Sequence, residues 1–273
     1  MPAGNKPHYL DPEHPNYIRW KRSRDISFER GRFVKTIVSK YKSIRSIKVL
    51  DIGSGFGGTV QNFLDDTNQI YSIEIDEFKL SNQPEHKALK KFNCDAFKLP
   101  FEEKFDVIIL QDFIEHIERP KQFFFYIKNF LKDDGIIYIS TPNRLSIINL
   151  IADPHWGFPV ISMLSRKVIK KFFIPIFRRK ERNRNDIAEL LSLKKLKELF
   201  SETGFKFNLH TVEAVQTLFE NPHQIIWSDF HLFLLKLIKP TKVDQLIKRI
   251  ANNKTGFLNK YITPTFFMIL KKH

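Results

Sequence analysis

Hydrophobic residues in this chain occur in short runs that are separated by glycine, proline and charged residues. Near-continuous apolar runs, which are typical of strands buried on both faces of a sheet, lie near residues 48–52, 70–75, 90–93, 105–110 and 135–140. The stretches between these runs are long enough for helices. This alternation of strands and helices predicts a parallel sheet with right-handed crossover connections.

Further elements are predicted on both sides of this alternation. Residues 27–41 carry apolar side chains at the spacing of one helix face, and two more helices are predicted over 230–238 and 243–250. A helix followed by a strand is predicted over 192–207, and a last strand over 264–271. We therefore expect one α/β domain with helical additions.

The first apolar run leads directly into a glycine-rich loop. Asp51 and Ile52 precede four glycines between positions 53 and 58, and a helix is expected to begin near Thr59. Glycines let a ligand approach the backbone, and the free N–H groups of the helix N-terminus lie beside that ligand. This order predicts a nucleotide-type site at the carboxyl end of a parallel sheet. The loop alone is a weak signal, because it also fits an NAD-type site and, less well, a plain tight turn.

Two acids that follow later strands make the site more specific. Glu74 ends the second strand and follows the loop by about the 20 residues expected of a ribose-binding carboxylate. This position fits both NAD and S-adenosylmethionine. Asp95 follows the third strand, where a carboxylate can reach an adenine amino group.

The fourth and fifth strands carry the most informative segments. These are residues 105–110 (FDVIIL), 112–117 (DFIEHI) and 131–143 (LKDDGIIYISTPN). Together with the glycine loop and the two acids, they resemble the class I S-adenosylmethionine-dependent methyltransferases, in particular the small-molecule O-methyltransferase branch that includes the ubiquinone-biosynthesis enzymes. The same segments disfavour an NAD dehydrogenase. The resemblance covers 48–143 without interruption of the motif order.

The resemblance implies a Rossmann-like, doubly wound, mostly parallel seven-stranded sheet with an antiparallel final strand. It also implies a division of the chain. The expected parts are an N-terminal arm and helix at 1–47, the cofactor-binding core at 48–143, an acceptor-pocket insertion at 144–190, and the C-terminal part of the fold at 191–273 with a helical extension at 213–262.

The cofactor implied by the resemblance is S-adenosyl-L-methionine. Its amino-acid portion would lie on the glycine loop, with Asp51 near its ammonium group and Glu74 on the ribose hydroxyls. The full set of cofactor residues expected from the family motifs is Asp51, Gly53, Ser54, Gly55, Gly57, Glu74, Ile75, Asp95, Ala96 and Gln111.

A hydroxyl acceptor must lose its proton, so a base or a metal is expected near the methyl group. Asp112, Glu115 and His116 match the E-x-x-E-H segment that binds a divalent cation in the ubiquinone-type enzymes, with aspartate in place of the first glutamate. His116 is alternatively a metal-free general base, or Glu115 and His116 only cap and pack a turn. His155, in a polar and aromatic turn of the insertion, is a second candidate base or substrate contact, or a structural histidine.

Charge and cysteine content bear on partners and compartment. The formal net charge is +15, and residues 166–184 interleave cations with large apolar side chains. This pattern predicts peripheral contact with an anionic membrane surface or a grip on a phosphorylated substrate, although a packed helix with snorkelling basic side chains gives a similar pattern. The single cysteine, Cys94, excludes an internal disulfide and fits the cytoplasm. The N-terminal residues lack the apolar core of a signal peptide.

Three functions are therefore compared. The sequence favours an S-adenosylmethionine-dependent O-methyltransferase with a small or lipid-linked acceptor of the sugar, quinone or phenol type. The basic charge raises an RNA methyltransferase as an alternative, but no N/D-P-P-Y/F/W motif, Pro-Cys nucleophile or RNA-binding module is present. A catalytically silent, cofactor-binding partner subunit remains the third alternative.

Overall fold

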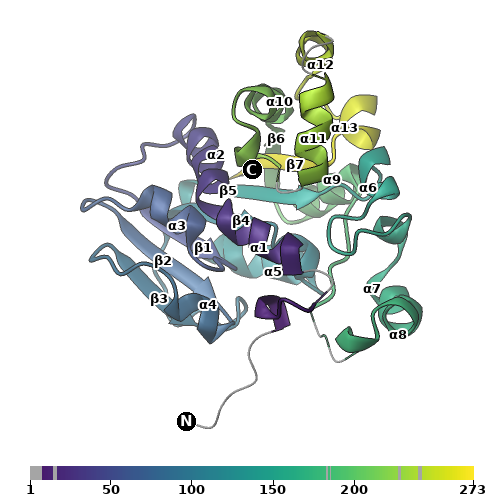
Figure 1. The fold of residues 1–273 in the computed structure, drawn as a ribbon. Helices are drawn as coiled ribbons and strands as arrows, with labels where there is room; N and C mark the ends of the chain where they lie inside the picture. Colours follow the sequence, from purple (N-terminus) through teal and green to yellow (C-terminus); the bar gives the residue numbers. More distant parts are fainter. Residues whose placement is uncertain (1–7, 15–16, 183, 185, 227–228, 239–241) are drawn as a thin grey trace.

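The computed structural model describes residues 8–14, 17–182, 184, 186–226, 229–238 and 242–273. Within these residues, seven strands form one sheet in the order β3-β2-β1-β4-β5-β7-β6 (Figure 1). Strands β1 to β5 pair in parallel, and β7 is antiparallel to both β5 and β6. The predicted mostly parallel sheet with a reversed final strand is confirmed. The strands are β1 Lys48–Ile52, β2 Gln69–Glu74, β3 Leu89–Asn93, β4 Phe105–Gln111, β5 Leu131–Pro142, β6 Phe205–Leu209 and β7 Thr265–Lys272.

Helices cover both faces of this sheet and extend beyond its edge. The α-helices are α1 Tyr17–Asp25, α2 Ser27–Ser39, α3 Gly58–Phe63, α4 Glu77–Ser81, α5 Pro120–Ile127, α6 Ile147–Ile151, α7 Arg166–Val168, α8 Ile174–Phe177, α9 Leu193–Glu202, α10 Thr211–Glu220, α11 Asp229–Ile238, α12 Val243–Ile250 and α13 Phe257–Tyr261. The predicted helix at 27–41 ends two residues early, and the helices expected at 230–238 and 243–250 are confirmed. Short 3₁₀ turns include η1 His8–Leu10 and η2 Ile114–His116, and η5 Ile169–Phe173 is a π-helix.

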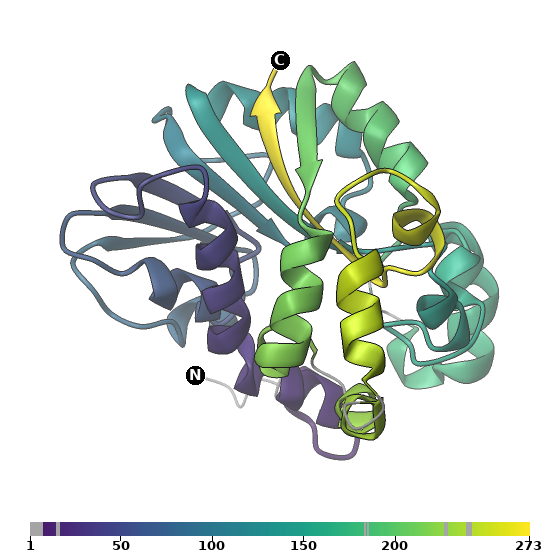
Figure 2. The same cartoon turned by 90° about the horizontal axis from the view of Figure 1, so that it is seen from above.

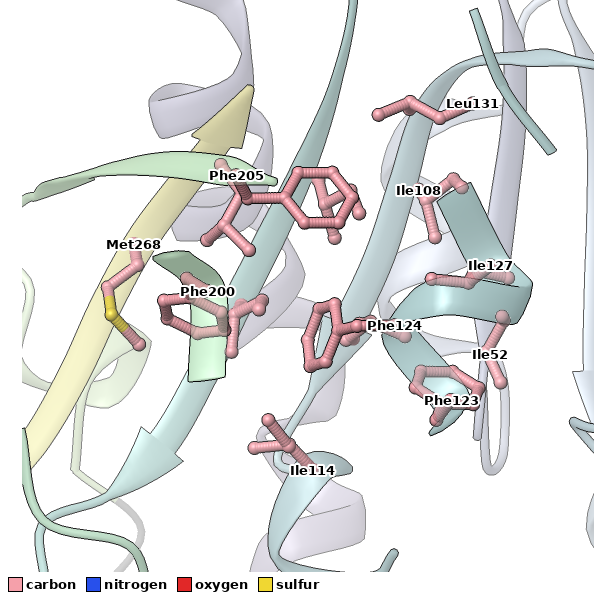
Figure 3. Packing of buried hydrophobic residues seen from close by; sticks show 14 of the residues in the cluster. Ile52, Ile108, Ile114, Phe123, Phe124, Ile127, Leu131, Phe200, Phe205 and Met268 are labelled. Carbon is pink, nitrogen blue, oxygen red and sulfur yellow. The ribbon is translucent and has the colours of Figure 1, made fainter. Parts of the chain in front are cut away.

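Each face of the sheet has its own apolar core, because neighbouring residues of a strand point to opposite faces. In β4, Ile108 and Leu110 join the cluster beneath α5 and α9, whereas Val107 and Ile109 join the cluster beneath α2 and α3. A strand buried on both faces needs apolar residues at every position, which accounts for its continuous apolar run. Figure 3 shows the first cluster, in which the ring of Phe124 faces that of Phe200.

Residues 144–190, which follow β5, have a separate small core. Trp156, Ile169, Phe173 and Ile187 are buried together, apart from the two clusters of the sheet. Figure 2 shows α6, α7 and α8 at one side of the sheet, opposite α2 and α3. The segment therefore projects beyond the carboxyl end of β5. Its predicted role in building an acceptor pocket stays a prediction.

Candidate functional site

The glycine loop that follows β1 has the backbone conformation that its sequence predicts. Gly53 and Gly57 have φ values of +73° and +76°, in the left-handed region that favours glycine. The N–H groups of Gly53 and Ser54 both donate to the carbonyl of Ile73, at 2.9 and 3.1 Å, and so fix the loop to β2. At Gly55 the space that a Cβ would enter is open. The fixed loop thus leaves one side accessible to a ligand.

Two carboxylates meet this loop. Glu74 accepts hydrogen bonds from the N–H groups of Gly55 and Asp76, both at 2.9 Å. Asp51 is only 2% exposed, and its Oδ2 atom has no hydrogen-bond partner among the described residues. Burial, together with the charge of Glu74, raises the pKa of Asp51 to about 7. A buried carboxylate oxygen without a donor fits a cationic ligand such as the ammonium group of an amino acid.

The remaining predicted cofactor residues lie at the carboxyl ends of the adjacent strands. Gln111 ends β4 and accepts a hydrogen bond from Thr59 of α3. Ile75 and Asp95 are exposed just after β2 and β3, and Ala96 is half-buried beside Asp95. The loop, the acids and Gln111 therefore share one edge of the sheet, as a nucleotide-type cofactor requires.

Gln83 is a member of this site that the sequence did not reveal. Its side-chain amide donates to Ser54 Oγ at 2.9 Å and to the carbonyl of Gly55 at 2.7 Å, and its oxygen accepts from Ser72 Oγ at 2.7 Å. It therefore links the glycine loop to Ser72 of β2. No motif marks such a position, because the contact depends on how α4 and the following turn pack.

The N-terminal residues 9–14, here called the N-terminal strap, reach the same loops. The hydroxyl of Tyr9 donates to Asp76 at 2.7 Å, and its ring packs edge-on against Phe56 of the glycine loop. Farther along the strap, His14 lies 3.6 Å from Glu181 of the 144–190 segment, and both side chains are buried. The strap therefore connects the cofactor loops to that segment.

Asp112 follows β4 but does not face the other predicted metal ligands. Its carboxylate pairs with Arg30 of α2, and its Oδ1 accepts from Ser140 Oγ at 2.7 Å. Burial is the largest influence and opposes its ionisation, but the charge and hydrogen bond of Arg30, together with the hydrogen bond from Ser140, lower the pKa of Asp112. Asp112 also has a φ of +50°, in the left-handed region that aspartate tolerates better than most residues. The structure thus assigns this carboxylate to a pair with Arg30.

Glu115 and His116 instead lie together with His155, so that His155 takes the place of Asp112 in the predicted ligand set. Nitrogen and oxygen atoms of these three side chains all lie within 4.8 Å of one another. Glu115 is buried; Thr141 Oγ1 donates to its Oε2 at 3.0 Å, and His155 Nε2 lies 3.9 Å from its Oε1. In the part of the chain that the structure describes, Glu115 Oε1 has no hydrogen-bond partner.

Asp186 is a fourth member of this cluster, and it was not predicted. Its carboxylate contacts Nδ1 of His116. Burial is the largest influence and lowers the pKa of His116, but the hydrogen bond to Asp186 and the charges of Asp186 and Glu115 together make the net shift upward. Burial together with the charge of His116 lowers the pKa of His155 to about 3. Burial raises the pKa of Glu115 to about 7. The cluster therefore holds one neutral and one readily protonated imidazole beside a buried acid.

These residues fit a divalent cation as well as proton transfer. One carboxylate oxygen and two imidazoles form a common donor set for such ions. A ligating histidine typically has a carboxylate on its other ring nitrogen, as His116 has in Asp186. The Oε1 atom of Glu115, which has no hydrogen-bond partner among the described residues, is an oxygen atom that could ligate such a cation.

Comparison with known proteins gives the same assignment of fold. A sequence profile described as "Methyltransferase domain" matches residues 45–204. The ubiquinone biosynthesis O-methyltransferase of Rickettsia bellii (strain OSU 85-389) is 25% identical over 142 residues, which are 50% of this chain and 53% of that protein. The enzyme of that name from Glaesserella parasuis serovar 5 is 31% identical over 109 residues, 36% of this chain and 46% of that protein. The chain spans about half the length of the curated relatives it matches.

Solved structures extend the likeness over almost the whole chain. The plantazolicin methyltransferase BpumL, solved in complex with SAH, has a TM-score of 0.56 at 17% identity and covers 97% of this chain and 92% of its own. A methyltransferase from Mesorhizobium loti has a TM-score of 0.56 at 10% identity and covers 87% of this chain and 96% of its own. At such identities the likeness is one of fold.

The strand order, the glycine loop and the acid that ends β2 together define a class I S-adenosylmethionine-dependent methyltransferase fold. The profile match extends over more than half of the residues. The chain belongs to the methyltransferase domain family.

Proposed function

We propose that this chain transfers a methyl group from S-adenosylmethionine to a hydroxyl oxygen of a small or lipid-linked acceptor, of the quinone, phenol or sugar type. The observation that carries this proposal is the buried cluster of Glu115, His116 and His155. Glu115 and His116 follow β4 at the same edge of the sheet as the cofactor loop, and His155 joins them from the segment after β5. The names of the curated relatives, which are O-methyltransferases of ubiquinone biosynthesis, support an oxygen acceptor.

The proposed reaction is an in-line displacement. The acceptor oxygen forms a bond to the methyl carbon, the carbon–sulfur bond breaks, and S-adenosylhomocysteine leaves with the bonding electrons on sulfur. The hydroxyl proton passes to a base of the protein. Most of the rate enhancement comes from holding the two reactants aligned in a site from which water is excluded.

Each residue of the cluster has a place in this proposal. The unpaired Oε1 of Glu115 accepts the proton, and His155, 3.9 Å away, orients the hydroxyl between them. Asp186 is a positioning residue that fixes the ring of His116 through Nδ1. A divalent cation, when bound by Glu115, His116 and His155, would supply Lewis-acid activation of the acceptor oxygen.

The test uses the purified chain with methyl-labelled S-adenosylmethionine and a panel of catechols, hydroxyquinols, polyprenylated phenols and sugars. We expect label in at least one of these acceptors, and His155→Ala to lower turnover about 100-fold or more because the acceptor loses its orienting group. Cofactor affinity, measured by calorimetry, stays unchanged. His86→Ala, near β3 and distant from the cluster in the fold, is the matched control and keeps wild-type turnover.

Two results would contradict the proposal. One is wild-type turnover of His155→Ala, which would make that histidine structural. The other is label that enters RNA but none of the small acceptors. Repeating the assay with EDTA distinguishes a metal-free site from one that binds a divalent cation. If EDTA abolishes turnover and added Mg²⁺ or Mn²⁺ restores it, the cluster binds a cation.

A further inference from the structure

The helical segment 166–177, formed by α7, η5 and α8, has apolar side chains on two opposite faces. Ile169, Phe173 and Ile174 point inward and are buried in the core of the 144–190 segment. Val168, Phe172 and Ile176 are exposed, at a spacing of four residues that places them along one side of a helix. Phe172 alone is 53% exposed. A helix that needed only to pack on the protein would carry polar side chains on this outer side.

The same segment carries a concentrated positive charge. Lys167, Lys170 and Lys171 are exposed beside the outer apolar side chains, and Arg179 follows them. The sequence has no aspartate or glutamate between Asp153 and Glu181. Among the described residues, no ion pair joins these four cations to an acid. The outer side of the segment is thus both apolar and cationic.

Two helices at the same side of the molecule also carry exposed apolar residues. Ile151 of α6 and Phe257 of α13 are 68% and 71% exposed. The two helices are adjacent, since Ser146 Oγ, just before α6, donates to the carbonyl of Ile262, just after α13, at 3.1 Å. Figures 1 and 2 both show α6, α7, α8 and α13 at the same side of the molecule. No described helix is long and apolar enough to cross a bilayer.

We propose that segment 166–177 docks this protein on an anionic lipid bilayer. The outer apolar side chains enter the boundary between headgroups and acyl chains, and the lysines stay among the anionic headgroups. The anionic bilayer is inferred from charge complementarity. An apolar patch that binds another protein would not need the four neighbouring cations, which have no acidic partner among the described residues. Each lysine near an anionic membrane, in contrast, adds favourable binding energy.

Docking at this place brings the bilayer next to the candidate site. Arg166, the first residue of the segment, donates from its guanidinium group to the carbonyl of Glu115 at 3.0 Å and to the carbonyl of Ile187 at 2.6 Å. The segment is therefore anchored directly to the cluster that is proposed to act on the acceptor. The membrane proposal stands on the outer surface alone and does not depend on the nature of the acceptor.

The test is co-sedimentation of the full chain with vesicles of phosphatidylcholine alone or of phosphatidylcholine with phosphatidylglycerol, at low and high NaCl. We expect binding only to the vesicles that contain phosphatidylglycerol, and weaker binding at high salt because the charges are screened. Lys170→Gln with Lys171→Gln lowers the partition coefficient about tenfold or more. Phe172→Ala lowers it about fivefold, through lost apolar burial.

Matched controls keep the interpretation specific. Lys194→Gln with Lys195→Gln removes the same charge from exposed positions of α9, and Phe125→Ala removes a ring of similar exposure, 48%, from α5. Both controls retain wild-type binding, and all variants keep the wild-type unfolding temperature. The proposal fails if the chain binds neutral vesicles equally well, or if the controls weaken binding as much as the variants do. It also fails if the lysine substitutions reduce RNA binding and leave vesicle binding unchanged.

Discussion

At the scale of single residues, Asp51 shows how a buried group prepares the site for its ligand. The carboxyl group lies at the end of β1, away from water, with one oxygen unpaired among the described residues. Burial makes the charged form unfavourable until a cation arrives. The sulfonium cofactor carries an ammonium group, and we expect binding of that group to restore the carboxylate.

This view predicts a proton that is released when the cofactor binds. The pKa of Asp51 in the free protein is raised to about 7, so the carboxyl is mostly protonated below that pH, and a bound ammonium favours its ionised form. Cofactor affinity therefore rises as the pH increases from about 5.5 to about 7. Calorimetry near pH 6.5, in two buffers of different ionisation enthalpy, measures the released proton. Equal apparent enthalpies in the two buffers would contradict the prediction, and Asp51→Asn should abolish any difference.

The residues around the glycine loop can be picked out from the sequence, whereas the cluster of Glu115, His116 and His155 can be picked out only in part. The glycines, Asp51 and Glu74 are identified by local rules, because a turn at the end of a strand needs particular residues at a fixed spacing. Asp186 joins His116 only through the path of the insertion, which no local pattern describes. Asp112 pairs with Arg30 of α2, a contact between segments that are distant in the chain and that no local pattern describes.

At the scale of elements, α5 shows how two adjacent phenylalanines differ in burial. Phe124 is fully buried, with its ring centroid 5.3 Å from that of Phe200 in α9 and 5.9 Å from that of Phe205 in β6. Phe125, the next residue, points to solvent because successive residues are turned by about 100° around a helix. The side chain of Phe124 therefore packs α5 against both α9 and β6.

The expected consequence is a large difference in stability between two similar substitutions. Phe124→Ala lowers the free energy of unfolding by about 3–5 kcal/mol, since it leaves a cavity in the core. Phe125→Ala changes it by less than about 1 kcal/mol. Urea unfolding followed by circular dichroism provides the comparison. Similar losses for both variants would show that the packing around α5 differs from that described.

Element boundaries were harder to predict than element types. The sequence predicts the fifth strand near 135–140, but β5 begins at Leu131. Its first residues include Lys132, Asp133 and Asp134, and their pairing with β4 contains a register shift. A polar start of this kind has no apolar periodicity, so the hydrophobic pattern does not reveal that the strand already pairs with β4 at Leu131.

At the scale of the whole molecule, the N-terminal strap joins the two halves of the candidate site. Tyr9 contacts the cofactor loops, and His14 contacts Glu181 of the segment that supplies His155 and Asp186. We therefore expect a bound cofactor to lie beneath this segment, which is attached on both sides. Cofactor exchange then requires that these contacts open.

We therefore expect Tyr9→Phe to release S-adenosylhomocysteine faster. The variant loses a hydrogen bond to the carboxylate of Asp76, and bonds of this kind contribute about 1.5–3 kcal/mol, which corresponds to roughly tenfold or more in the dissociation rate. Stopped-flow fluorescence measures that rate. Tyr261→Phe, on an exposed position of α13, is the control and leaves it unchanged. An unchanged rate for Tyr9→Phe would mean that the strap does not limit release.

The place of β7 in the sheet also has a consequence for how the protein is made. β7 lies between β5 and β6, although both of them precede it in the chain. During synthesis on the ribosome, β6 leaves the exit tunnel long before the strand that it must pair with. In the nascent chain, β6 therefore stays unpaired until residues 265–272 have been synthesised. We expect a chaperone to bind the chain at this unpaired strand.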